Sequence, residues 1–277
     1  MQIDGNSLTL ETAAKVIYAN TQVTLAPSAK KQIAASREVI THCLDEDKPI
    51  YGINTGFGKL AEIQIPHDHL NELQENLVMS HACGVGEPAS QEDVRAILLL
   101  KANTLAKGFS GVREQIIEFL LALLNKNVLP VIPQKGSVGA SGDLAPLAHL
   151  ALVVIGQGEV FLEGKKFPAQ SVHSQMGMTP IKLLAKEGLA LLNGTQFMAG
   201  LGVVNWHLAK NLLLNADVIG AMSAEGMMGT PVAFDERIHL ARGHRGQIES
   251  ARRLRDMMQD SPIRDSHKEC GRVQDPY

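Results

Sequence analysis

The sequence predicts a mainly α-helical protein with a small mixed region near the N-terminus and one short hairpin. Aromatic residues make up only 4% of the 277 residues, whereas 45% are hydrophobic. This balance favours close-packed helices over β-sandwiches, whose faces need aromatic and β-branched pairs. Apolar residues also recur at helical spacing along several segments, and one long segment rich in glycine and proline interrupts them. We therefore expect a helical bundle with a sizeable core.

The first half of the chain contains three well-marked helical segments. Apolar residues at 70, 73, 77 and 78 form one stripe on a predicted helix over 68–82, which Gly84 ends. A second helix begins at Ser90, where Asp93 completes a variant of the capping box, and stops at Gly108. Residues 112–124 contain an apolar run from Ile116 to Leu124, interrupted only by Glu118, which predicts a helix at the centre of the bundle.

The second half begins with an irregular loop over 129–144 and then returns to helices. A helix is expected over 146–155, followed by a hairpin over 159–167 that turns at Gly164. Thr179 and Pro180 are typical of a helix start and predict a helix from there to Leu192. We expect a long helix over 195–223 and a charged helix over 244–258.

Composition and charge exclude several classes of function. With 26 basic and 29 acidic residues the net charge is −3, so the positive potential that nucleic acid or an anionic membrane would require is missing. The N-terminus is polar, and no apolar run approaches the ~18 residues of a membrane span, which together predict a cytoplasmic protein. The three cysteines are scattered along the chain, which predicts a protein without disulfides. His67 and His69 have no third ligand at suitable spacing, so we expect no metal site.

The segment with the most informative chemistry is the loop over 136–146, GSVGASGDLAP. A phosphate-binding loop would need a lysine followed by serine or threonine, and a hydrolase elbow needs the order G-x-S-x-G; neither is present. Ala140-Ser141-Gly142 permits another reaction, because the unhindered Gly142 nitrogen could close on the Ala140 carbonyl carbon. Loss of water from that ring and from Ser141 would leave an electrophilic exocyclic methylene. Taken alone, the tripeptide is more often a plain turn.

Residues 136–150, GSVGASGDLAPLAHL, resemble the signature of the aromatic amino-acid ammonia-lyases, whose Ala-Ser-Gly matures into methylidene-imidazolone (MIO). Four further motifs resemble this family in the same order: YGINTGFG over 51–58, SHACG over 80–84, LNGTQ over 192–196 and VQDPY over 273–277. The similarity covers nearly the whole chain and is greatest to the members that act on histidine. It implies the family's helical-bundle fold, with an N-terminal active-site domain over 1–110 and the first part of the central bundle over 111–277.

The resemblance also implies a role for each site residue. Among the predicted catalytic residues, Tyr51 would act as the base. Ala140, Ser141 and Gly142 would form the MIO. Asn193 would contact the MIO and the substrate amine, and Tyr277 is the last predicted catalytic residue. The predicted substrate-binding residues are His81 and Gln274, and Asp143 would support ring closure.

Several of these positions have a plainer structural interpretation. Tyr51 could pack beside the glycine-rich turn that follows it, and His81 could cap the end of its own helix. Asn193 and Gly194 could form a simple turn, and Asp143 could be the N-cap of the helix that begins near Pro146. The residues alone leave both interpretations open.

The activity implied by the resemblance is elimination of ammonia from L-histidine to give trans-urocanate, a step of histidine catabolism, by a homotetramer without an external cofactor. A tyrosine or phenylalanine ammonia-lyase or an aminomutase is a neighbouring alternative, and a non-catalytic helical scaffold or pseudoenzyme is an alternative of another class. Because the chain stops inside a motif at Tyr277, we expect the 277-residue polypeptide to have little or no activity and to associate through exposed apolar faces.

Overall fold

The computed structural model describes residues 1–46, 48–269 and 271, and it divides the chain into two compact units, 1–205 and 206–277. Helices dominate both units, which confirms the predicted fold class. Among the described residues, no helix is both long and apolar enough to cross a bilayer. The division expected after residue 110 stays a prediction, and the helices on either side of that point pack against each other.

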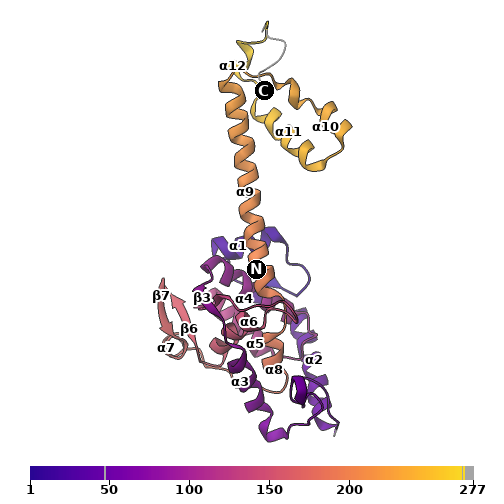
Figure 1. The fold of residues 1–277 in the computed structure, drawn as a ribbon, viewed down its shortest axis with the longest axis vertical. Coiled ribbons are helices and arrows are strands. Elements are labelled where there is room, and N and C mark those ends of the chain that lie inside the picture. The colour runs from indigo at the N-terminus through magenta and orange to yellow at the C-terminus, as the bar shows by residue number, and fades with distance from the viewer. Residues whose placement is uncertain (47, 270, 272–277) are drawn as a thin grey trace. The chain divides into compact units, whose positions relative to one another are not determined.

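The first unit is built around three apolar helices, α4, α5 and α6, which lie at its centre in Figure 1. Their core side chains, such as Leu98, Ile117 and Leu147, are fully buried. The helices of this unit are α1 (Leu10–Ala19), α2 (Pro27–Asp45), α3 (Leu70–His81), α4 (Gln91–Ala106), α5 (Glu114–Asn125), α6 (Leu144–Val154), α7 (Ala169–Gln175), α8 (Glu187–Leu192) and the first part of α9 (Gln196–Gly226), with short 3₁₀ helices at Gly58–Leu60 and His67–His69.

Short strands join the ends of these helices. A parallel pair is formed by β1 (Gln2–Ile3) and β2 (Thr24–Leu25), and an antiparallel pair by β3 (Val85–Pro88) and β5 (Pro133–Lys135). A three-stranded sheet has the order β4 (Leu129–Pro130), β6 (Glu159–Leu162) and β7 (Lys165–Pro168). The predicted hairpin is confirmed at β6–β7, where Glu163 and Gly164 both have positive φ, as a tight two-residue turn requires.

Most of the predicted helices are confirmed. The Ser90 hydroxyl accepts a hydrogen bond from the Asp93 backbone N–H at 3.1 Å, so α4 begins where the capping signal places it. The helices expected over 68–82, 112–124, 146–155 and 195–223 correspond to α3, α5, α6 and α9. The loop expected over 129–144 contains β4 and β5, so it is less irregular than predicted.

The helix predicted from Thr179 to Leu192 is wrong over its first half, because helical structure begins only at Glu187. The backbone N–H of Ile181 instead bonds the Val154 carbonyl at 2.9 Å. The N–H of Leu184 bonds the Glu187 carboxylate at 2.8 Å. A distant carbonyl and a nearby side chain therefore take the backbone donors that a local helix would have needed.

The second unit contains the rest of α9, a 3₁₀ turn (Pro231–Phe234), α10 (Glu236–Arg242), α11 (Arg245–Met257) and α12 (Pro262–Asp265). Arg253 pairs with Asp217 at 2.6 Å and so fixes α11 against α9. Arg252 bonds Asp256 and Glu249 within α11, which corresponds to the charged helix expected over 244–258. Several large apolar side chains of α9 are exposed: Leu208, Leu212, Leu213, Ile219 and Met222.

Candidate functional site

Three helices of the first unit bring several of the predicted site residues into one region. Helices α3, α6 and α8 all contact one another. His81 is the last residue of α3, Asn193 directly follows α8, and Ala140–Gly142 lies just before α6. Residues separated by more than a hundred positions in the sequence are thus carried on the ends of mutually packed helices.

The Ala140–Gly142 segment is held through its glycine. Gly142 has φ +105° and forms a parallel β-bridge with Gly194. The backbone N–H of Asp143 donates to the Gly194 carbonyl at 2.7 Å. A Cβ at position 142 would collide with that carbonyl and would lie 3.0 Å from the Gly194 nitrogen, so only glycine fits. Ala140 and Ser141 are exposed, so the segment is both anchored and accessible.

Asp143 is fully buried and connects the same loop to a second helix. One carboxylate oxygen accepts from the Ser137 hydroxyl at 2.7 Å, and the other accepts from the Met198 backbone N–H at 2.8 Å. Asp143 occupies the N-cap position of α6, as one interpretation expected, but its side chain makes no bond to α6. It caps the first turn of α9 instead. The loop therefore lies beside two helix N-termini, whose positive ends favour negative charge.

The segment that follows His81 is fixed to the loop by His149 of α6. The Gly84 backbone N–H donates to His149 Nε2 at 3.0 Å. Because Nε2 accepts, the neutral ring carries its proton on Nδ1, and burial lowers the pKa of His149 in agreement with that state. Strands β3 and β5 pair directly beyond these residues, and a Cβ at Gly136 would lie 3.0 Å from the Gly84 Cα. The two loops are thus in close contact.

His81 itself is half-buried, and its ring is oriented by its own helix. Nδ1 lies 2.9 Å from the Leu77 carbonyl and 3.1 Å from the Ser80 hydroxyl. Since a carbonyl can only accept, Nδ1 is the donor, and in the neutral ring Nε2 holds the lone pair. The interpretation of His81 as a helix cap agrees with this bond, and the bond is also compatible with a substrate contact at Nε2.

Tyr51 lies in a loop that rests on α8. Gly52 has φ +77°, and a Cβ there would collide with the Leu189 side chain. The Tyr51 side chain is 61% exposed and packs edge-to-face on Phe57, with ring centroids 6.0 Å apart. This contact agrees with the interpretation of Tyr51 as a packing residue, and its role as the base stays a prediction.

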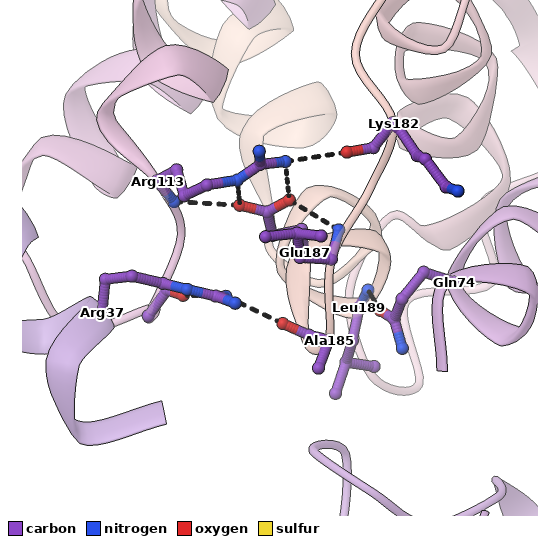
Figure 2. A network of polar contacts seen from close by, with 9 residues as sticks. Arg37, Gln74, Arg113, Lys182, Ala185, Glu187 and Leu189 are labelled. Carbon is purple, nitrogen blue, oxygen red and sulfur yellow. Dashed lines mark hydrogen bonds and ion pairs between the residues drawn. The ribbon is translucent and has the colours of Figure 1, made fainter. Parts of the chain in front are cut away.

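A buried network that the sequence analysis missed fixes α8 (Figure 2). The Glu187 carboxylate is fully buried and accepts from Arg113 Nε at 2.8 Å, from a second guanidinium N–H at 2.7 Å and from the Arg113 backbone N–H at 3.0 Å. Arg37 bonds the Ala185 carbonyl at 2.9 Å, and the Gln74 amide oxygen accepts from Leu189 N–H at 3.2 Å. A glutamate within the apolar stretch 183–192 was the sequence feature that could have predicted this buried network.

Lys101 of α4 was also missed, although it lies directly behind Asn193. Its Nζ donates to the Asn193 backbone carbonyl at 2.8 Å, and its side chain is almost completely buried. Burial lowers the pKa of Lys101 to about 7. A lysine inside the apolar run over 96–102 could have signalled it.

Gln274 and Tyr277 are outside the described residues. His69 is exposed and contacts Glu72 at 3.2 Å. Within the described part of the chain, no group of three residues could hold a metal ion.

Comparison with known sequences matches the chain to an established family. A sequence model of the aromatic amino acid lyases matches residues 8–277. Histidine ammonia-lyases of Myxococcus xanthus and Bacillus subtilis are each 49% identical over 99% of this chain and 54% of their own length. The chain therefore spans about half the length of the curated relatives it matches.

Solved structures share the fold. The tyrosine aminomutase of Streptomyces globisporus has a TM-score of 0.91 at 35% identity, over 100% of this chain and 54% of its own. The histidine ammonia-lyase of Trypanosoma cruzi has a TM-score of 0.87 at 39% identity, over 96% and 52%. With sequence and fold matched along nearly all its residues, the chain belongs to the aromatic amino acid lyase family, which includes carbon–nitrogen lyases named for histidine.

Proposed function

We propose that this chain carries the electrophile-forming part of an ammonia-lyase that converts L-histidine into trans-urocanate and ammonia. The observation that carries the proposal is the exposed Ala140–Gly142 segment, anchored by Gly194 and Asp143 beside the N-termini of α6 and α9. The histidine ammonia-lyases at 49% identity support the choice of substrate.

The residues present fit formation of an MIO. In that reaction the Gly142 nitrogen bonds the Ala140 carbonyl carbon, and the Ala140 carbonyl oxygen leaves as water with the hydrogens of the Gly142 and Ser141 N–H groups. The Ser141 hydroxyl leaves with the Ser141 α-hydrogen as a second water. Gly142 has no side chain to hinder the attack, and its positive φ already bends the backbone there. The mature group supplies an electrophilic carbon that makes the substrate amino group a good leaving group, so no external cofactor is required.

The other proposed residues act directly on the substrate. Tyr51 removes the β-proton, a role for which its phenolate is needed. His81 presents Nε2 as an acceptor, which suits the ring N–H of an imidazole substrate. The Asn193 amide nitrogen donates to the Leu189 carbonyl at 3.1 Å, which orients the amide for the substrate amine. Gln274 and Tyr277 complete the proposed site, and the two helix N-termini stabilise negative charge that develops beside them.

Intact-protein mass tests the proposal on the 277-residue chain. MIO formation removes two waters, so the measured mass should be ~36 Da below the mass calculated from the sequence. Ser141→Ala should lack this deficit, whereas Ser171→Ala, which changes an exposed serine on α7, should retain it. An unmodified wild-type chain would contradict the proposal and favour a non-catalytic scaffold.

Substrate choice requires a second measurement, because the tyrosine aminomutase shares the fold at a TM-score of 0.91. Urocanate absorbance with histidine, and product analysis with tyrosine and phenylalanine, separate a histidine lyase from a tyrosine or phenylalanine lyase. Recovery of a β-amino acid would identify an aminomutase instead.

The assembly, location and domain division rest on the resemblance. The exposed apolar side chains of α9 support association into the proposed homotetramer. Cytoplasmic location and a division into 1–110 and 111–277 are proposed with it.

A further inference from the structure

We infer that Lys101 is a positioning residue for the Ala140–Gly142 segment. Its hydrogen bond to the Asn193 carbonyl keeps Gly194 in contact with Gly142. The consequence for ring formation rests on the proposed function. The positioning itself does not, because it concerns only the geometry of this chain.

Packing alone does not explain a lysine at this position. The Lys101 side chain is 1% exposed, and its polar partners within the described residues are neutral: the Asn193 carbonyl at 2.8 Å and the Gln196 amide oxygen at 3.5 Å. The Gln196 amide nitrogen is in turn held by the Thr104 hydroxyl at 3.2 Å. A buried ammonium without an anionic partner opposes folding, whereas methionine would fill a similar volume without that cost. The hydrogen bond to Asn193 is therefore the distinguishing feature of Lys101.

That bond acts on the peptide group nearest to the reactive segment. In a planar trans peptide the C=O and N–H point in opposite directions, so a carbonyl drawn toward Lys101 turns the Gly194 N–H away from α4. The Gly194 nitrogen lies 3.0 Å from the position that a Cβ on Gly142 would occupy. The Gly194 carbonyl then accepts the Asp143 N–H at 2.7 Å. Two successive peptide groups thus connect Lys101 to the Ala140–Gly142 segment.

The same geometry places the Asn193 side chain. Asn193 directly follows α8, and its backbone is fixed on one side by Lys101. On the other side its amide bonds the Leu189 carbonyl. Loss of Lys101 would release the Asn193 carbonyl and leave the two bonds that the Asn193 backbone N–H and side-chain amide make to the Leu189 carbonyl. Alignment of both the reactive segment and the proposed amine contact therefore depends on one buried donor.

Hydrogen exchange measures this positioning without reference to activity. In the 277-residue chain, Lys101→Met should raise the exchange rate of the Asp143 amide about tenfold, because opening of the Gly142–Gly194 contact becomes easier. Lys101→Arg retains a charged donor and should stay within about twofold of wild type. Lys126→Met removes a lysine bond to another backbone carbonyl, that of Met176, and should leave the Asp143 amide unchanged.

The rate of appearance of the ~36 Da deficit after synthesis measures the consequence for ring formation. Lys101→Met should slow it about 100-fold through misalignment, and Lys101→Arg should restore it. If the methionine variant does not fold or arginine does not fit, Lys101→Gln provides a neutral donor, and its Asp143 exchange should lie between those of wild type and Lys101→Met.

The outcomes separate the two proposals. Unchanged Asp143 exchange in Lys101→Met overturns the positioning role, whatever the mass shows. Raised exchange together with normal ring formation overturns the catalytic consequence. Raised exchange, rescued by arginine, in a wild-type chain that lacks the mass deficit supports the positioning role and contradicts the proposed function alone.

Discussion

Arg113 and Lys101 are two buried or half-buried cations of the first unit that are stabilised in opposite ways. Arg113 meets the Glu187 carboxylate through two guanidinium N–H groups, and this bond raises the pKa of Arg113. Lys101 bonds a carbonyl and an amide oxygen, and burial lowers its pKa. The paired cation fixes the start of α8 (Figure 2), whereas Lys101 bonds Asn193, the residue that follows the end of α8.

The difference between the two cations shows where this fold contains an interaction that opposes its stability. The Arg113–Glu187 pair satisfies its own charges, so its effect is to fix the position of a short helix. Lys101 is costly to bury, and its hydrogen bonds go to the Gln196 amide oxygen and to the Asn193 carbonyl, next to the turn against Gly142. Local rules of stability are often broken at functional sites. On this comparison, Arg113 serves the scaffold and Lys101 serves the reactive loop.

The largest effect on stability is expected from Glu187→Ala. The substitution leaves the Arg113 side chain, only 29% exposed, without its carboxylate and leaves the Leu184 N–H without its acceptor. We expect the free energy of unfolding to fall by about 3–5 kcal/mol, measured by urea denaturation. Glu118→Ala is the matched control, because Glu118 pairs with Lys30 at an exposed position and should change stability by less than about 1 kcal/mol. Equal losses in the two variants would remove the distinction between buried and exposed pairs.

A smaller effect, visible as a pH dependence, is expected from Lys101→Met. The pKa of Lys101 is about 7 in the folded chain and about 10.4 when unfolded, so between these values the unfolded state binds one more proton. Stability of the wild type relative to Lys101→Met should therefore rise with pH, by about 2 kcal/mol between pH ~7 and ~9, and should level off below pH ~7. Urea denaturation of both proteins across this pH range measures whether the stability difference rises or falls with pH. An anionic partner would instead hold the pKa of Lys101 near or above its unfolded value, and the difference would then stay flat between pH ~7 and ~9.

Much of the fold was predictable because its signals are local. Each of these signals lies within a few positions of the element that it predicts. Examples are the capping residues Ser90 and Asp93, the turn at Gly164 and the apolar run over 112–124. The motif around Ser141 was equally visible, because the stretch over 136–150 as a whole resembles the signature of a known family, although its Ala-Ser-Gly alone does not identify it.

The rest depended on contacts between distant residues. Nothing near Thr179 and Pro180 shows that the backbone around Ile181 bonds α6 or that Glu187 bonds Arg113 of α5. Lys101 and Asn193 are likewise 92 positions apart. Asp143 occupies the N-cap position of its own helix, one of the two roles that the residues left open, but its side chain caps α9, whose position only the tertiary fold determines.

The smallest effect is expected from Asp143→Asn, a third buried charge that extends the comparison. Like Glu187, Asp143 has hydrogen-bond donors for both oxygens, but these come from a hydroxyl and a helix N-terminus rather than from a cation. Asparagine keeps one acceptor at nearly the same place, so only the charge and one bond are altered, and the free energy of unfolding should fall by about 1 kcal/mol. Ser137→Ala, which removes the other bond, should cost a similar amount in the same urea titration. A fall in the free energy of unfolding near that of Glu187→Ala would mean that the negative charge of Asp143 itself anchors the loop. Asp143 would then already neutralise the helix N-termini, and they would not be available to stabilise charge that develops on the reactive segment.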